Sequence, residues 1–215
     1  MRILLLCLLL GIVPISQADV PVARVNGVEI SSMRLERYFA EYLQDQGRPV
    51  TSIRSPSLYK RLRDQALDEL IDKELLWQEA QRRGVAVSDD SVSARMAELE
   101  QAFGSPAVFE SRLAEAGFDR AGYADYTRHE MAAQQLYTQM SAIDEPTPVQ
   151  VEAFYQANKE RLHGMQNQST NTPVEREQGL ALARAALVGE MQAQARQSVR
   201  QRLREGAKVE FANSM

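Results

Sequence analysis

The strand-like patterns of this sequence lie at its two ends, and this constrains the fold more than any other feature. Residues 20–25 and 28–31 flank Asn26-Gly27, a pair that favours a two-residue hairpin turn because both turn positions need positive φ. Residues 208–211 alternate polar and apolar side chains, as a half-buried strand does. A hairpin alone is marginally stable, and a single strand needs a partner. We therefore predict that both chain ends meet in one small antiparallel sheet.

The two-residue turn also predicts the register of the hairpin. It sets apolar residues opposite apolar ones and an acidic residue opposite a basic one. The expected pairs are Val25 with Val28, Arg24 with Glu29, and Ala23 with Ile30.

Between the two ends, the sequence is typical of helices almost without a break. Apolar side chains recur every three or four residues, as in Leu62, Ala66 and Leu70. Each predicted helix begins at a residue that can cap its first turn, several times followed by proline, which the first helical position tolerates. We expect a mainly α fold of several helices, closed by the small sheet. The predicted caps are Ser31 or Ser32, Ser55, Ser88, Ser105, Asp119, Thr147 and Thr172.

The first eighteen residues fit a cleavable secretory signal. Arg2 precedes an apolar stretch at 3–15, which is too short to span a bilayer comfortably because a spanning helix needs about 20 apolar residues. Ser16 and Ala18 place small residues at the −3 and −1 positions of a signal-peptidase site. We predict cleavage after Ala18, export to the periplasm and no stable membrane insertion.

The cysteine content and the net charge of the chain argue against thiol chemistry and against a nucleic-acid partner. Cys7 is the only cysteine and lies early in the apolar stretch, so we expect neither lipidation nor, after cleavage, any disulfide or thiol chemistry. The formal net charge is −4 with both signs interspersed. A nucleic-acid-binding surface needs a basic patch, so we expect no nucleic-acid partner.

Five short segments follow one another in a recognisable order. They are residues 22–30, 67–76, 83–88, 147–162 and 199–211. In this order they resemble the N-terminal domain of the SurA-type periplasmic chaperones and their PrsA-like relatives, with the last two segments as those that leave the domain and return to it. The resemblance implies one helical chaperone domain, made of residues 19–162 and completed by residues 173–215.

One departure from that family concerns catalysis. In many of its members a parvulin prolyl-isomerase domain lies between the leaving and the returning segments, whereas here residues 163–172 form a polar linker too short for any domain. His129 and His163 have no neighbours at metal-ligand spacing, and no phosphate-binding or nucleophile motif is present. We therefore expect no catalytic residue, no cofactor and no metal.

Large adaptable side chains are the candidates for peptide binding, because Met and aromatic residues accept many sequences. At helical spacing such residues more often belong to a core, so we expect only a minority of the candidates to line a groove. The candidates are Met33, Phe39, Tyr42, Leu43, Trp77, Phe103, Phe109, Phe118, Met131, Tyr137 and Met140.

The leading functional hypothesis is a periplasmic, ATP-independent holdase that binds unfolded or extended segments of exported proteins, outer-membrane proteins among them. A second hypothesis is a dedicated accessory subunit of a secretion or polysaccharide-export system. A third is a prolyl isomerase with an unrecognised site. Self-association into a homo-oligomer through an exposed groove is compatible with each of them.

Overall fold

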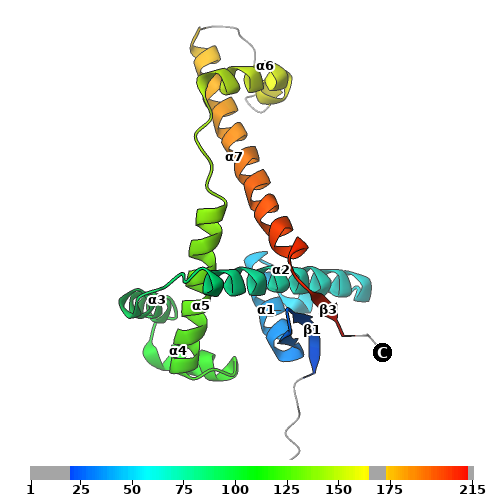
Figure 1. Cartoon of the computed structure of the whole chain (residues 1–215), viewed down its shortest axis with the longest axis vertical. Helices are drawn as coiled ribbons and strands as arrows, with labels where there is room; N and C mark the ends of the chain where they lie inside the picture. Colours follow the sequence, from blue (N-terminus) through cyan, green and yellow to red (C-terminus); the bar gives the residue numbers. More distant parts are fainter. Residues whose placement is uncertain (1–19, 165–172, 213–215) are drawn as a thin grey trace, which may run out of the picture.

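The computed structural model of the chain describes residues 20–164 and 173–212 (Figure 1). Within these ranges it contains seven α-helices, one short 3₁₀ helix and three strands, which confirms the predicted mainly α fold. The 3₁₀ helix was not predicted. The elements are β1 (Pro21–Val25), β2 (Val28–Ser31), α1 (Ser32–Asp45), η1 (Val50–Ser52), α2 (Pro56–Arg82), α3 (Asp89–Ala102), α4 (Pro106–Glu115), α5 (Arg120–Met140), α6 (Pro148–Gly164), α7 (Pro173–Glu205) and β3 (Val209–Phe211).

Two predicted segments fall wholly or mostly outside the described residues. The signal at 1–18 is one of them. The other is the linker predicted at 163–172, of which only the first two residues are described, and these belong to α6.

Side-chain caps begin six helices at predicted positions, Thr147 among them, and the predicted cap Thr172 lies outside the described residues. The hydroxyl oxygens of Ser31, Ser55, Ser88 and Ser105 accept from the backbone N–H three residues further on, at 3.2 to 3.3 Å. The Asp119 carboxylate accepts in the same way at 2.7 Å. Each cap satisfies a backbone donor that the first turn of a helix leaves without an intrahelical partner.

The sheet joins the two ends of the described chain. β1 lies in its centre and pairs antiparallel with β2 on one side and β3 on the other. Asn26 and Gly27 have φ values of 51° and 87°, as a two-residue hairpin turn requires. Both the meeting of the ends and the predicted hairpin register are confirmed. The observed pairs include Ala23 with Ile30, Arg24 with Glu29, and Val25 with Val28.

Backbone and side-chain hydrogen bonds connect the hairpin turn to the start of β3 and to α2. The Asn26 N–H donates to the Lys208 carbonyl, and the Lys208 N–H donates to Asn26 Oδ1, both at 2.8 Å. Asn26 Nδ2 donates to Gln78 Oε1 on α2 at 2.8 Å. Gln78 Nε2 donates at 2.9 Å to the buried carboxylate of Glu74, which also accepts from Arg34 on α1. Asn26 therefore connects the N-terminal hairpin both to the C-terminal strand and to α2.

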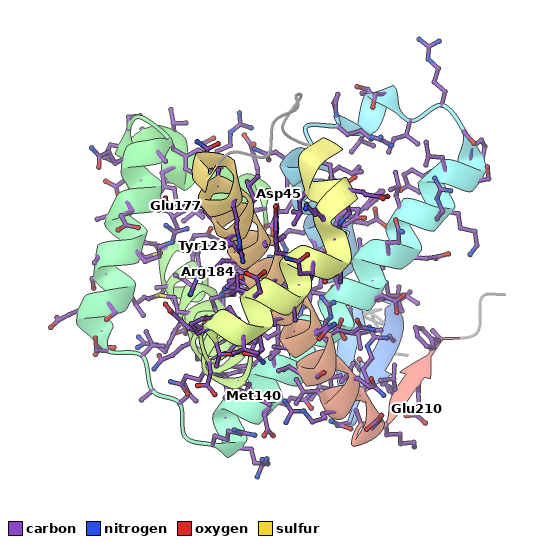
Figure 2. All side chains as sticks on the ribbon, turned by 90° about the horizontal axis from the view of Figure 1, so that it is seen from above. Asp45, Tyr123, Met140, Glu177, Arg184 and Glu210 are labelled. Atoms are coloured by element: carbon purple, nitrogen blue, oxygen red, sulfur yellow. The ribbon has the colours of Figure 1, made fainter. Side chains whose placement is uncertain are left out.

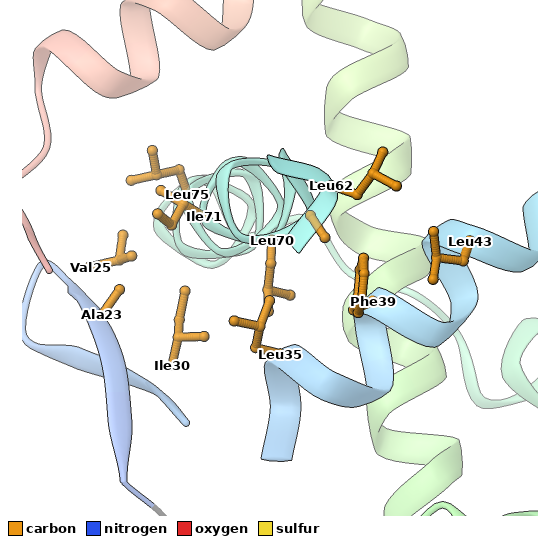
Figure 3. Packing of buried hydrophobic residues seen from close by; sticks show 11 residues of the cluster. Ala23, Val25, Ile30, Leu35, Phe39, Leu43, Leu62, Leu70, Ile71 and Leu75 are labelled. Carbon is orange, nitrogen blue, oxygen red and sulfur yellow. The ribbon is translucent and has the colours of Figure 1, made fainter. Parts of the chain in front are cut away.

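The main core lies between the sheet, α1 and α2 (Figure 3). Ala23 and Val25 point inward from β1, whereas Arg24 between them is exposed, as the alternation of a strand requires. Side chains of α2 cover those of α1 and of the hairpin. The buried residues of this core are Ala23, Val25, Ile30, Leu35, Phe39, Leu43, Leu62, Ala66, Leu70, Ile71 and Leu75.

Helices α3, α4 and α5 form a second packed unit, which is attached to α2. Ala80 on α2 and Ala132 and Leu136 on α5 are buried against one another, and the small alanines allow the two helices to approach closely. The unit has a core of its own, made of Val92, Met96, Phe109 and Leu113.

Helix α6 and residues 173–190 of α7 form an arm at the far end of the molecule from α1 (Figure 1). Residues 141–147, which adopt neither helix nor strand, lead from α5 to α6. The Tyr155 ring packs directly on Gly179, where an added Cβ would lie 2.6 Å from the ring. The buried residues of the arm are Val151, Tyr155, Leu162 and Ala183.

The base of α7 is fixed to the body of the molecule. Val199 is fully buried beside Leu76 of α2 and Ala133 of α5. Arg204 donates to the Asp72 carboxylate at 2.5 Å and to the Asp68 carbonyl at 2.8 Å. Seen from above, α7 runs from the arm towards the edge of the molecule where β3 lies (Figure 2). The returning helix therefore delivers β3 to the sheet from a fixed direction.

Candidate functional site

A groove lies between α1 on one side and α3, α4 and α5 on the other, with α2 contributing to its floor. It consists of three adjoining hollows, which we name the α5 hollow (about 1040 Å³), the central hollow (about 150 Å³) and the α4 hollow (about 880 Å³). Glu41 lines all three. Tyr126 lines the first two and Arg37 the last two, so the hollows follow one another between the same helices.

Aromatic rings follow one another along the α3–α5 side of this groove. They form a chain of contacts because the end of α3, the helix α4 and the first turns of α5 converge there. Tyr123 opens onto the α5 hollow, Phe118 onto the central hollow and Phe103 onto the α4 hollow. The centroid distances are 5.7 Å for Phe103–Phe109, 6.0 Å for Phe109–Tyr123, 5.3 Å for Tyr123–Phe118 and 5.4 Å for Phe118–Tyr126.

The α5 hollow combines apolar side chains with amides and hydroxyls. Val87, Leu99 and Met131 supply the apolar part. Such amide and hydroxyl groups can donate to and accept from a peptide backbone without regard to its sequence. The polar residues of the hollow with these groups are Ser88, Ser91, Thr127, Gln134, Gln135, Thr138 and Gln139.

Charged groups cross the groove at its centre. Lys73 on α2 forms an ion pair with Glu130 on α5 at 2.5 Å, and its ammonium lies 5.1 Å from the centroid of the Tyr38 ring. The Arg37 guanidinium on α1 lies 4.2 Å from the centroid of the Phe118 ring and donates to a backbone carbonyl at the end of α4. These contacts hold the two sides of the groove at a fixed separation.

Glu41 is the charged residue at the point where the hollows meet. Glu41 is exposed, yet the neighbouring helices shield its carboxyl from part of the solvent, and this desolvation is the main cause of the raised pKa of the carboxyl. The Lys73 and Arg37 cations oppose this rise in pKa, whereas the Glu130 and Asp45 carboxylates add to it. Desolvation also raises the pKa values of the Tyr38 and Tyr126 hydroxyls, so both are neutral hydrogen-bonding groups at neutral pH.

Comparison with known proteins identifies the family. Residues 2–137 match the model of the SurA-like N-terminal domain. The chain belongs to the SurA-like N-terminal domain family. That family is defined by a chaperone domain and not by a catalytic one. None of the curated proteins matches the sequence.

A solved structure shares the fold of this SurA-like chain. It comes from work on the virulence factor PEB4 and the periplasmic protein Cj1289 of Campylobacter jejuni, described as two structurally related SurA-like chaperones. The TM-score is 0.52 and the identity 11%, and the match covers 91% of this chain and 100% of the other. The match covers more of the chain than the family model, which ends at residue 137.

Four of the predicted peptide-binding residues line the groove of the SurA-like domain. Met33 and Phe103 are 61% and 43% exposed, and both line the α4 hollow although one comes from α1 and the other from the end of α3. Phe118 lines the central hollow and Met131 the α5 hollow. The fold therefore brings together residues that are far apart in the sequence.

The remaining candidates lie elsewhere, and three of them require a correction. Phe39, Leu43 and Phe109 are at most 2% exposed, so they are core residues that a peptide cannot reach in this structure. The spacing along a helix is the same for core residues and for groove residues, so it does not distinguish between them. These three side chains lie on the side of their helix that faces the core. Tyr42 is half-buried and packs against the same core as Phe39.

Trp77, Tyr137 and Met140 are half-buried where α2 and α5 meet the base of α7, away from the groove. The Trp77 ring stacks on His129, with centroids 3.9 Å apart. Desolvation lowers the pKa of this histidine, which favours its neutral form. These residues join elements of the fold, and the groove is built without them.

The groove residues that escaped the sequence analysis include Tyr38, Glu41, Tyr123 and Tyr126. Tyr123 and Tyr126 are three residues apart and share a helix face, as do Tyr38 and Glu41. That spacing was visible in the sequence. The packing of α1 and of α5 against α2 determines which face of each helix borders the groove. The spacing of residues along the sequence carries no information about this packing.

No metal-binding group of three or more His, Cys, Asp and Glu side chains is present in the described part of the chain. None of the helices within residues 20–164 and 173–212 combines the length and the apolar character that a membrane span requires.

Proposed function

We propose that the chain is a periplasmic, ATP-independent chaperone that holds extended segments of exported proteins, including outer-membrane proteins, in the groove between α1 and α3–α5. Membership of the SurA-like family supports a chaperone role. The signal predicted at 1–18, with cleavage after Ala18, supports the compartment. In this proposal residues 19–162 and 173–215 form one chaperone domain, and residues 163–172 connect its two parts.

The observation that carries the proposal is the chain of aromatic rings beside a wall rich in amides and hydroxyls. An extended segment presents side chains alternately to opposite sides and a backbone donor and acceptor at every residue. Aromatic rings and Met33 or Met131 can accept many apolar side chains, and the amides of Gln134 and Gln135 can bind backbone. Such a groove binds by general features of a polypeptide and discriminates little among sequences.

We further propose that the chain does not catalyse prolyl isomerisation. Only the eight residues at 165–172 separate α6 from α7, at the position where parvulin-containing relatives carry that domain. A prolyl-isomerisation assay on the mature chain should show no rate above background. Acceleration that a groove mutation abolishes would establish an unrecognised site.

The proposal is tested with residues 19–215 as a purified protein and an unfolded outer-membrane protein diluted from denaturant. The chain should suppress light scattering without nucleotide. Phe103→Ser should weaken this suppression, because an apolar contact in the groove is lost, by about 1 to 3 kcal/mol of binding free energy. Phe211→Ser is the matched control, since Phe211 is also an exposed phenylalanine, at 58%, but lies on β3.

Two results would count against the proposal. One is the absence of any effect of the wild-type chain on several unfolded clients at excess. The other is an equal loss of suppression in both phenylalanine variants. Tight binding to one folded partner, with no binding to unfolded clients, would instead support a dedicated accessory subunit.

A further inference from the structure

The carboxylates that line the groove differ in whether they have a partner. Within the described residues, Glu41 makes neither a hydrogen bond nor an ion pair, although it lines all three hollows. The other carboxylates of the groove are each neutralised by a neighbouring cation. These ion pairs are Glu36–Arg63 at 2.7 Å, Glu115–Arg112 at 2.9 Å and Glu130–Lys73 at 2.5 Å.

The cations that line the groove are, in contrast, all engaged. Arg37 lies over the Phe118 ring and donates to a carbonyl. Arg34 donates to the buried Glu74 carboxylate at 2.7 Å, and Arg95 pairs with a glutamate of its own helix at 2.9 Å. Lys73 and Arg112 belong to the pairs given above. Arg37 is the one cation among these without a carboxylate partner, and together with Lys73 it acts on Glu41 through space. Within the described residues no cation contacts the Glu41 carboxylate directly, so a basic client side chain can form the ion pair that Glu41 lacks.

The surroundings of Glu41 also suit the stem of a long basic side chain. Tyr38 lies one helical turn before it, and Tyr126 and Phe118 line the central hollow with it. Lysine and arginine carry an apolar stem that packs on aromatic rings while the charged end reaches a polar partner.

From this arrangement we infer that the groove binds a lysine or arginine side chain of the client segment, with its cation on the Glu41 carboxylate and its stem against Tyr38, Phe118 and Tyr126. The inference rests on the proposed peptide-binding function and adds a preference to it. An ion pair at one point would fix the position of the client segment along the groove, whereas the rest of the groove binds the segment without sequence preference. The raised pKa of Glu41 is consistent with this role. It shows that the charged form of the carboxyl is disfavoured in the empty groove, and a bound cation would stabilise that form.

The test compares two fluorescent unfolded peptides that are identical except at one central position. One peptide carries lysine there, and the other carries norleucine, which has the same stem without the cation. The wild-type chain should bind the lysine peptide about two- to fivefold more tightly, the range expected for a solvent-accessible ion pair. Glu41→Gln should abolish this preference, so that the two peptides bind the variant with the same affinity. Glu115→Gln is the matched control, because this groove carboxylate already has a partner, and the preference should persist in it.

The outcomes separate the two proposals. If both peptides bind equally well to the wild-type chain, or if Glu41→Gln keeps the lysine preference, the role of Glu41 is wrong and the chaperone groove stands. If neither peptide binds, the proposed function fails and the inference fails with it. Circular dichroism of each variant establishes that it is folded before its affinity is compared.

Discussion

At the scale of single residues, position in the fold decides between structure and function. Phe103 and Phe109 are six residues apart and their rings touch, yet one is 43% exposed in the groove and the other is fully buried in the α3–α5 core. Glu74 and Glu41 show the same contrast among carboxylates. Glu74 is buried but has hydrogen-bond partners on two elements, whereas Glu41 lines the groove without one. Glu41 is therefore the carboxylate that can form an ion pair or hydrogen bond with a ligand.

The raised pKa of Glu41 gives a prediction for stability. In the folded chain this carboxyl binds a proton more readily than in the unfolded chain, so its ionisation disfavours folding as the pH rises above its ordinary pKa. Glu41→Gln removes the charge and should raise the Tm slightly at neutral pH. The gain should shrink as the pH falls towards the range in which the wild-type carboxyl is protonated. Thermal melts of both chains across this range check the prediction, and a variant that is less stable at neutral pH would contradict it.

At the scale of elements, local signals predicted where helices begin but not which faces they bury. The caps at Ser55, Ser88 and Ser105 depend on a few adjacent residues, so the sequence contains all that determines them. The same holds for the Asn26-Gly27 turn and the hairpin register. The groove depends instead on how α1 and α5 are each rotated against α2, which arises from long-range packing. The sequence therefore allowed Met33 and Phe103 to be predicted as candidates, but it did not allow the prediction that they lie close together.

The arm supplies an element-scale prediction through its two glycines on α7. Gly179→Ala should loosen α6, because the new methyl group would collide with Tyr155 and overpacking costs about 1 to 3 kcal/mol. This exceeds the roughly 1 kcal/mol by which alanine favours a helix over glycine. Hydrogen exchange of the α6 amides measures the effect.

Gly189→Ala is the control for that experiment, because the added Cβ at this position has no neighbour within 4 Å among the described residues outside its own helical turn. It should stabilise α7 by up to about 1 kcal/mol. Equal protection of α6 in both variants would show that the Tyr155–Gly179 contact does not hold the arm together.

At the scale of the whole molecule, the chain closes on itself. α7 spans about 50 Å, at 1.5 Å for each of its 33 residues, and brings the C-terminal strand from the arm back to the N-terminal hairpin. Arg204 fixes the end of this helix to Asp68 and Asp72, and Asn26 binds the first residue before β3. The sequence predicted this closure because the strand patterns at its ends had only each other as partners.

Removal of the last strand tests the closure. Deletion of residues 207–215 should destabilise the chain by about 2 to 4 kcal/mol, since several backbone hydrogen bonds of β1 and the Asn26–Lys208 contacts are lost. Chemical denaturation measures the change. A truncation that ends at Ala212 keeps β3 and serves as the control. If both truncated chains unfold like the full one, the pairing of the ends contributes nothing to stability.

The central claim is that extended clients occupy the groove, and site-specific photo-crosslinking tests it most directly. A photoreactive phenylalanine replaces Phe103 in the α4 hollow, Gln135 in the α5 hollow or, as a control, Val149, which is 78% exposed on the arm. With an unfolded outer-membrane protein as client, we predict crosslinks from positions 103 and 135 and few from 149. Crosslinks from position 149 alone, with none from the two groove positions, would contradict the account.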